Sequence, residues 1–141
     1  MKDLILAREN LVSGVTLSLV SGDSVIIKRE RGVLPLLELF DTGMDFSSYS
    51  AADRVVGLGA AYLYLSLGIK KLYTIVISEA AYKKLVECGV YIEYDTITER
   101  IINRRGDGGC PIEEAVRDTK NVDEAITLIR KKLSELIGDN K

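Results

Sequence analysis

The sequence predicts an α/β fold of three α-β-α layers, in which helices cover both faces of a mixed β-sheet. Its 141 residues suit one domain of ordinary size, so we expect residues 1–141 to form a single domain. Apolar residues make up 47% of the chain and charged residues 28%, the balance of a globular protein with a packed core. Helical and strand-like segments also alternate along the chain, which is typical of a sheet between helices.

The first part of the chain predicts a helix, a hairpin and a second helix. Residues 2–12 carry apolar side chains at helical spacing, and residues 15–20 alternate as a half-buried strand. The turn-forming residues Ser21-Gly22-Asp23-Ser24 then lead to a strand over residues 25–28. A short helix is expected over residues 34–39, because a proline such as Pro35 is tolerated in the first turn of a helix.

The middle of the chain is richer in small and apolar residues. Residues 51–67 predict one helix buried on most sides, in which Gly57 and Gly59 allow close packing. A central buried strand is expected over residues 72–77. It is followed by a helix over residues 78–88 and a strand over residues 90–94.

The last part predicts a short helix that opens at Cys110-Pro111 and an amphipathic helix that begins near Asn121. The complete order is therefore helix, two strands, two helices, strand, helix, strand and two helices. A hairpin followed by a strand-helix-strand unit implies a mixed sheet.

Composition and charge argue against several classes of partner. The formal net charge of −2 gives no global basic field that would attract nucleic acid or an anionic membrane. No apolar run approaches the roughly 20 residues of a membrane span, and the first residues do not resemble a signal peptide. Two cysteines do not form the disulfide framework of a secreted domain. We therefore expect a cytoplasmic protein, with homo-oligomerisation left open.

The relative abundance of ionisable residues, together with the absence of glutamine, is typical of proteins from thermophiles. The chain also contains no histidine, so the usual proton shuttle of neutral pH is missing. A hydrolase that depends on a Ser-His-Asp triad is thereby excluded.

The predicted order of elements resembles the cytidine-deaminase-like fold. In zinc deaminases of that fold, a His/Cys-x-Glu element opens the buried helix and Pro-Cys-x-x-Cys opens the helix after the next strand. Here Ala51-Ala52-Asp53 and Ser78-Glu79-Ala80-Ala81 stand at these two places. A chain with two cysteines and no histidine cannot supply three His/Cys ligands, so we expect no zinc, no other cofactor and no cytidine or adenosine deamination.

Three segments resemble the family called domain of unknown function 1893. They are Ala52-Asp53-Arg54-Val55-Val56-Gly57, then Ile77-Ser78-Glu79, and then Asn103-Arg104 leading to Cys110-Pro111-Ile112-Glu113. The Cys-Pro-x-Glu segment is the most distinctive of the three. Because the family's name assigns no reaction, the resemblance implies a fold and no particular activity.

Asp53 and Ser78 are the first candidates for a functional site, and each also has a structural interpretation. Asp53 follows Ser50 at the Ser-x-x-Asp spacing of a helix cap, or its carboxylate takes the place of the deaminase general acid/base. Ser78 and Glu79 suit the start of a helix. They also lie at a strand-to-helix junction, where open α/β sheets bind ligands.

The glycine-rich segment before Pro111 supplies the remaining candidates. Gly108 and Gly109 could present backbone N–H groups to an anion, with Arg104 and Arg105 as countercharges, or they could simply allow the chain to turn. We expect the helix starts at Ala51, Ser78 and Pro111 to converge on one cleft, to which Glu113 also belongs.

Cys110 is the candidate nucleophile. A thiol at a helix start has a lowered pKa, whereas the nearby charge of Glu113 raises it. The alternative is that Cys110 is a packed cap, and Cys88 is expected in the core.

Three functions remain open at this stage. The first is a zinc-less protein of the deaminase fold that binds a small anionic or nucleotide-like ligand. The second is a thiol-dependent enzyme that uses Cys110, with Asp53 or Glu113 handling protons. The third is a structural subunit with a vestigial pocket.

Overall fold

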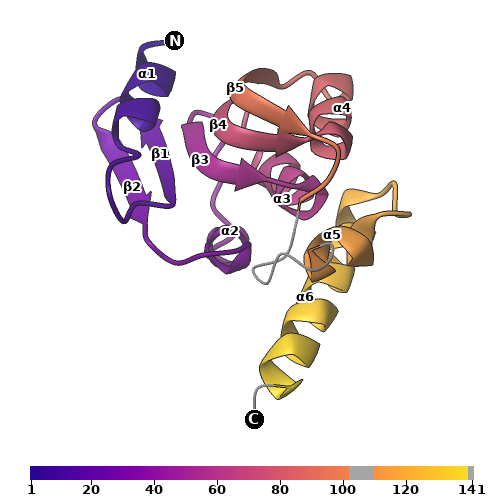
Figure 1. The fold of residues 1–141 in the computed structure, drawn as a ribbon. Helices are drawn as coiled ribbons and strands as arrows, with labels where there is room; N and C mark the ends of the chain where they lie inside the picture. Colours follow the sequence, from indigo (N-terminus) through magenta and orange to yellow (C-terminus); the bar gives the residue numbers. More distant parts are fainter. Residues whose placement is uncertain (102–109, 140–141) are drawn as a thin grey trace.

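The computed structural model describes residues 1–101 and 110–139 and contains one five-stranded sheet with helices on both faces (Figure 1). The elements, in chain order, are α1 (Lys2–Glu9), β1 (Leu17–Ser21), β2 (Ser24–Lys28), α2 (Leu34–Asp41), β3 (Ser50–Val56), α3 (Leu58–Leu67), β4 (Lys71–Ser78), α4 (Glu79–Glu87), β5 (Tyr91–Thr98), α5 (Pro111–Val116) and α6 (Val122–Asp139). The prediction of an α/β fold with a mixed sheet is confirmed.

The strands lie in the order β2-β1-β3-β4-β5. β1 pairs antiparallel with β2 and with β3, while β3, β4 and β5 are parallel to one another. The hairpin between β1 and β2 closes through Gly22 and Asp23, since Ser21 pairs with Ser24 and Gly22 adopts a φ of 57°. The carboxyl ends of the three parallel strands therefore lie at the same edge of the sheet.

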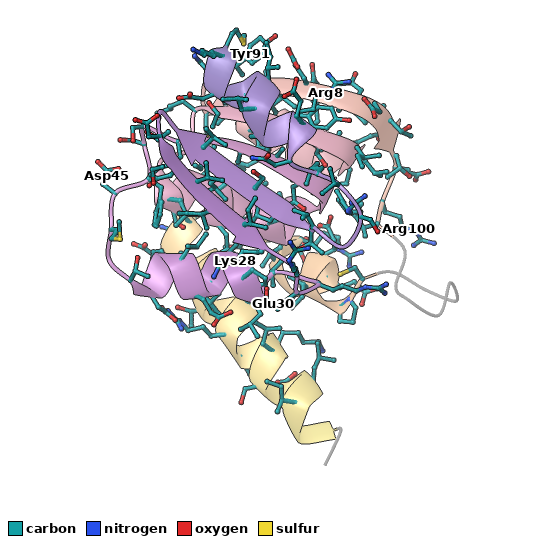
Figure 2. The ribbon with its side chains drawn as sticks, turned by 90° about the vertical axis from the view of Figure 1, so that its left-hand side faces the viewer. Arg8, Lys28, Glu30, Asp45, Tyr91 and Arg100 are labelled. Carbon is teal, nitrogen blue, oxygen red and sulfur yellow. The ribbon has the colours of Figure 1, made fainter. Side chains whose placement is uncertain are left out.

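The two faces of the sheet are covered unequally. The main core lies on one face, where side chains of α2, α3, α4, α5 and α6 pack against one another and against the strands. The opposite face carries α1 (Figure 2). The buried Leu4 and Ala7 of this helix pack on Val20, Ala52 and Tyr73. Within the described residues, α1 is the one helix whose side chains belong to this second cluster.

The prediction of one helix over residues 51–67 is wrong in its first half. Residues 50–56 form β3, the middle strand of the sheet, and α3 begins only at Leu58 with Gly57 as its N-cap. Ala51 packs in the main core and Ala52 in the cluster under α1, so the strand is buried on both faces. Small apolar residues on both faces produce no period-two pattern, and the sequence therefore resembled a buried helix.

The second half of that prediction is correct. α3 is buried along most of its length, and Gly68 ends it in the left-handed conformation at φ 83°. None of the helices among residues 1–101 and 110–139 has the length and hydrophobicity needed to cross a membrane.

Candidate functional site

The carboxyl ends of β3 and β4 are followed almost at once by helices. Gly57 separates β3 from α3, and Ser78 is both the last residue of β4 and the N-cap of α4. Because β3 and β4 are parallel neighbours, these two helix starts lie at the same edge of the sheet. Open α/β sheets bind their ligands at this kind of edge, so it is the candidate site.

Ser78 makes the capping contact that the sequence predicts. Its side chain is buried, and its Oγ accepts a hydrogen bond from the Ala81 N–H at 3.2 Å. In the neighbouring strand, Thr98 lies beside Ser78 in the parallel register. Glu79, the next residue, is exposed in the first turn of α4, where its charge suits the helix dipole.

Glu113 of α5 packs directly against the start of α3. Gly57 has no side chain, and a Cβ at this position would overlap the carboxyl group of Glu113. Two residues further along the chain, in the first turn of α3, a Cβ at Gly59 would overlap Ile112 in the same way. The two glycines are therefore needed for close contact between α5 and α3, although at a helix start rather than in the middle of a helix.

The environment of the Glu113 carboxyl group favours its neutral form. Burial raises the pKa of Glu113, while the Leu58 N–H and the Ser78 hydroxyl lower it by a smaller amount. Its Oε1 atom is buried and has no hydrogen-bond partner among the described residues. Glu113 does not cap Cys110, whose N–H instead donates to the carbonyl of Ile101 at 3.0 Å.

The prediction that the helix starts at Ala51, Ser78 and Pro111 converge on one cleft is therefore wrong for Ala51. Ala51 is a strand residue, and the first residues of α3 stand where Ala51 was expected. Glu113 does contact Gly57 and Ser78, but its carboxyl group fills the space beside Gly57, and Ile112 fills the space beside Gly59. The structure thus joins these helix starts by packing rather than around an open cleft.

Asp53 lies apart from this group. It is part of β3, so the predicted helix cap formed by Ser50 and Asp53 is wrong. Its Oδ2 accepts a hydrogen bond of 2.6 Å from the Tyr64 hydroxyl of α3. Burial raises the pKa of Asp53 to about 6, against the opposing effects of the Tyr64 hydroxyl and of two backbone N–H groups. The carboxyl group is therefore paired inside the fold and is not joined by any described contact to Ser78 or Glu113.

The two cysteines lie in different environments. Cys88 is exposed at the C-cap of α4, so its placement in the core is wrong. Cys110 is the N-cap of α5, is partly buried, and packs against the main core. A thiol-dependent reaction at Cys110 stays a prediction. The predicted anion contacts of Arg104, Arg105, Gly108 and Gly109 lie outside the described residues.

A shallow groove of about 370 Å³ lies at the same edge of the sheet. Its lining residues are Val55, Val76, Thr96, Thr98, Arg100 and Ile101. Val55, Val76 and Thr96 are matched across β3, β4 and β5, so the groove crosses the ends of all three parallel strands. The hydrogen bond from Cys110 to Ile101 connects the groove to the start of α5.

The sequence pattern did not predict these groove residues. Thr96 and Thr98 belong to the end of a strand that the sequence predicted only as far as residue 94, and Arg100 follows it. Hydroxyl groups at alternate positions of a strand end, followed by an arginine, were the available signal. The residues 1–101 and 110–139 contain no group of three or more His, Cys, Asp or Glu side chains close enough to hold a metal ion.

Comparison with known proteins identifies the family to which the chain is similar. The profile of the family "Domain of unknown function (DUF1893)" matches residues 5–133. The chain belongs to the DUF1893 family. The resemblance that the segments around Asp53, Ser78 and Cys110 indicated is thereby confirmed at the level of the family.

A solved structure supports the same assignment. The crystal structure of a DUF1893 family protein from Thermotoga maritima is similar to this chain with a TM-score of 0.82 and 26% sequence identity. The similarity covers 96% of this chain and 91% of the other. No curated protein matches the chain significantly. The DUF1893 match establishes the family and the α/β architecture, and it assigns no reaction.

Proposed function

We propose that this DUF1893 protein binds a small anionic, nucleotide-like molecule in the groove at the carboxyl ends of β3, β4 and β5. The observation that carries the proposal is the position of the groove. It opens where parallel strands of an α/β sheet end, and this is the usual ligand-binding edge of such sheets.

The groove residues suit the two parts of such a ligand. Val55, Val76 and Ile101 provide an apolar surface against which a flat ring can pack, and Val55 leaves 45% of its surface exposed. Arg100 is exposed, and the ion pairs formed within residues 1–101 and 110–139 do not include it. A guanidinium group can bind a phosphate or carboxylate through two parallel hydrogen bonds, so Arg100 is the expected anion contact.

We also propose that the fold is of the cytidine-deaminase type and has lost the means to bind zinc. In this proposal the helix start that carries His/Cys-x-Glu in the zinc enzymes is Gly57-Leu58-Gly59 here, six residues after Ala51. Glycine offers no side-chain ligand, and Ser78 and Ala81 replace the two cysteines. The donor set therefore does not fit zinc, and Ile112 and Glu113 occupy the space that ligand side chains would need.

The decisive experiment compares the thermal stabilisation of the folded protein by adenosine monophosphate, ribose 5-phosphate and adenosine. A ligand that binds only the native state raises the melting temperature in a saturable manner. We expect the monophosphate to stabilise most, because it alone offers both a flat aromatic ring and a phosphate. The substitution Arg100→Gln should weaken its apparent affinity at least tenfold, in line with the loss of one charge-assisted contact of roughly 1.5–3 kcal/mol.

The matched control is Arg117→Gln, which removes an exposed arginine at the C-cap of α5 and away from the groove lining. It should leave the affinity unchanged. If no member of the panel stabilises the protein, or if both arginine substitutions weaken binding equally, the proposed groove function is wrong.

A further inference from the structure

A second hollow lies at the opposite edge of the sheet, where β3 and β4 begin. It has a volume of about 130 Å³, and its lining includes Asp3, Ser48, Tyr49, Ser50, Lys70 and Lys71. Ser50 is the first residue of β3, Lys71 is the first residue of β4, and these two residues pair in the parallel register. The hollow is therefore separated from the groove by the length of the parallel strands.

The loop that forms one wall of this hollow is held by several contacts. Ser48 Oγ accepts a hydrogen bond from Ser21 Oγ at 3.0 Å, and the hydroxyls of Tyr49 and Ser24 lie 2.6 Å apart. Before them, Phe46 is buried, and its N–H donates to the carbonyl of Leu67 at 3.1 Å. The wall is thus fixed to β1, β2 and the end of α3 before any ligand arrives, which lowers the entropic cost of binding.

The hollow carries an excess of positive charge in a chain whose net charge is −2. Lys70 and Lys71 face one acid, Asp3, whose carboxylate already accepts a hydrogen bond from the Gly22 N–H at 3.3 Å. The ion pairs among residues 1–101 and 110–139 include neither lysine. Ser48 accepts from Ser21, so its own hydroxyl proton remains available for a ligand.

We propose that this hollow binds a phosphate group, independently of the groove that carries the proposed function. A volume of about 130 Å³ leaves room for a single tetrahedral oxyanion. Lys70 and Lys71 supply the charge, and the Ser48 hydroxyl supplies a directed hydrogen bond. The shared chemistry is a phosphate dianion, either free or at the end of a small organic molecule.

The test is an amide-resolved NMR titration of the full chain with sodium phosphate, at constant ionic strength because salt screens exposed charges. We expect saturable shifts at residues 47–50 and 70–71. The double substitution Lys70→Gln/Lys71→Gln should weaken phosphate binding at least tenfold, and Ser48→Ala should weaken it about threefold. The matched control is Lys131→Gln/Lys132→Gln, which removes an adjacent lysine pair from α6.

Two further measurements distinguish free phosphate from an organic phosphate, and the hollow from the groove. Tighter binding of glycerol 3-phosphate than of inorganic phosphate would assign the hollow to an organic phosphate, and the reverse would assign it to the free ion. Arg100→Gln should leave the shifts at residues 47–50 unchanged. Amide chemical shifts that do not saturate would overturn the proposal. An equal loss of phosphate affinity on substitution of the lysine pair in α6 would also overturn it. The amide spectrum of each variant also reports that it is folded.

Discussion

At the scale of single residues, the Asp53–Tyr64 pair has the clearest energetic consequence. Because burial raises the pKa of Asp53 from 3.8 to about 6, the folded state favours the protonated carboxyl group. The resulting contribution to stability is present in full below pH 3.8 and is lost as the pH rises through about 6. A shift of about two pKa units corresponds to roughly 3 kcal/mol, so the ionised Asp53 destabilises the fold by about this amount at pH 7.5.

We therefore predict that Asp53→Asn stabilises the protein at neutral and higher pH. The asparagine carbonyl can still accept the Tyr64 hydroxyl, while the cost of a buried charge disappears. The free energy of unfolding can be measured with urea at pH 4 and at pH 7.5. Between these two pH values, that of the variant should increase by about 2–3 kcal/mol relative to that of the native protein.

The matched control for this prediction is Asp95→Asn. Asp95 also accepts a tyrosine hydroxyl at 2.6 Å, from Tyr73, but Asp95 is exposed on the edge strand β5. Its charge stays hydrated in the folded state, so the substitution should produce little relative gain at pH 7.5. Equal gains for the two variants would mean that burial of Asp53 is not the cause.

At the scale of secondary-structure elements, the sequence predicts well where one face of an element is polar. The hairpin, α4 and α6 follow from alternation, turn residues and amphipathic spacing, and the structure confirms them. The prediction is wrong for β3, because a strand that is buried on both faces has no alternation of apolar and polar residues. The helical spacing of Ser50 and Asp53 then imitated a cap that the chain does not form.

The candidate site was predictable to a smaller extent than the fold. Ser78 could be placed at a helix start from local sequence, because a cap depends on neighbouring residues. The contacts of Glu113 could not be predicted from local sequence, because its partners Gly57 and Ser78 lie 56 and 35 residues earlier in the chain. The groove depends on register across three strands, which sequence spacing does not encode.

The contact between α5 and α3 gives the prediction at this scale. Gly57→Ala should destabilise the native protein by about 1–3 kcal/mol, because the added methyl group would overlap the Glu113 carboxyl group. In a Glu113→Ala background the overlap disappears, so the same substitution should cost less. Urea unfolding of the two single variants and the double variant measures this coupling, which for contacting residues is about 0.5–3 kcal/mol.

Gly59→Ala is the control for this cycle. Its methyl group would overlap Ile112 rather than Glu113, and its cost should therefore be the same with or without Glu113→Ala. If Gly57→Ala costs equally in both backgrounds, Glu113 does not pack against the start of α3.

At the scale of the whole molecule, the unequal covering of the sheet divides the fold into a large core and a small one. The large core combines side chains from five helices, whereas the second cluster consists of Leu4, Ala7, Val20, Ala52 and Tyr73. Arg8 adds to this attachment, since its guanidinium carbon lies 4.3 Å from the centre of the Tyr73 ring. The third layer of the fold thus depends on one helix of eight residues.

An isolated helix of this length is not stable in water, so α1 persists because its buried side chains pack on the sheet. Leu4 is 1% exposed, and we predict that Leu4→Ala lowers the free energy of unfolding by about 2–4 kcal/mol. Leu6 lies on the same helix and is 39% exposed, so Leu6→Ala should cost less than about 1 kcal/mol. Urea unfolding monitored by circular dichroism compares the two. A similar loss for both would show that α1 is not docked through Leu4, and hydrogen exchange of the Ala7 and Arg8 amides would then be fast in the native protein.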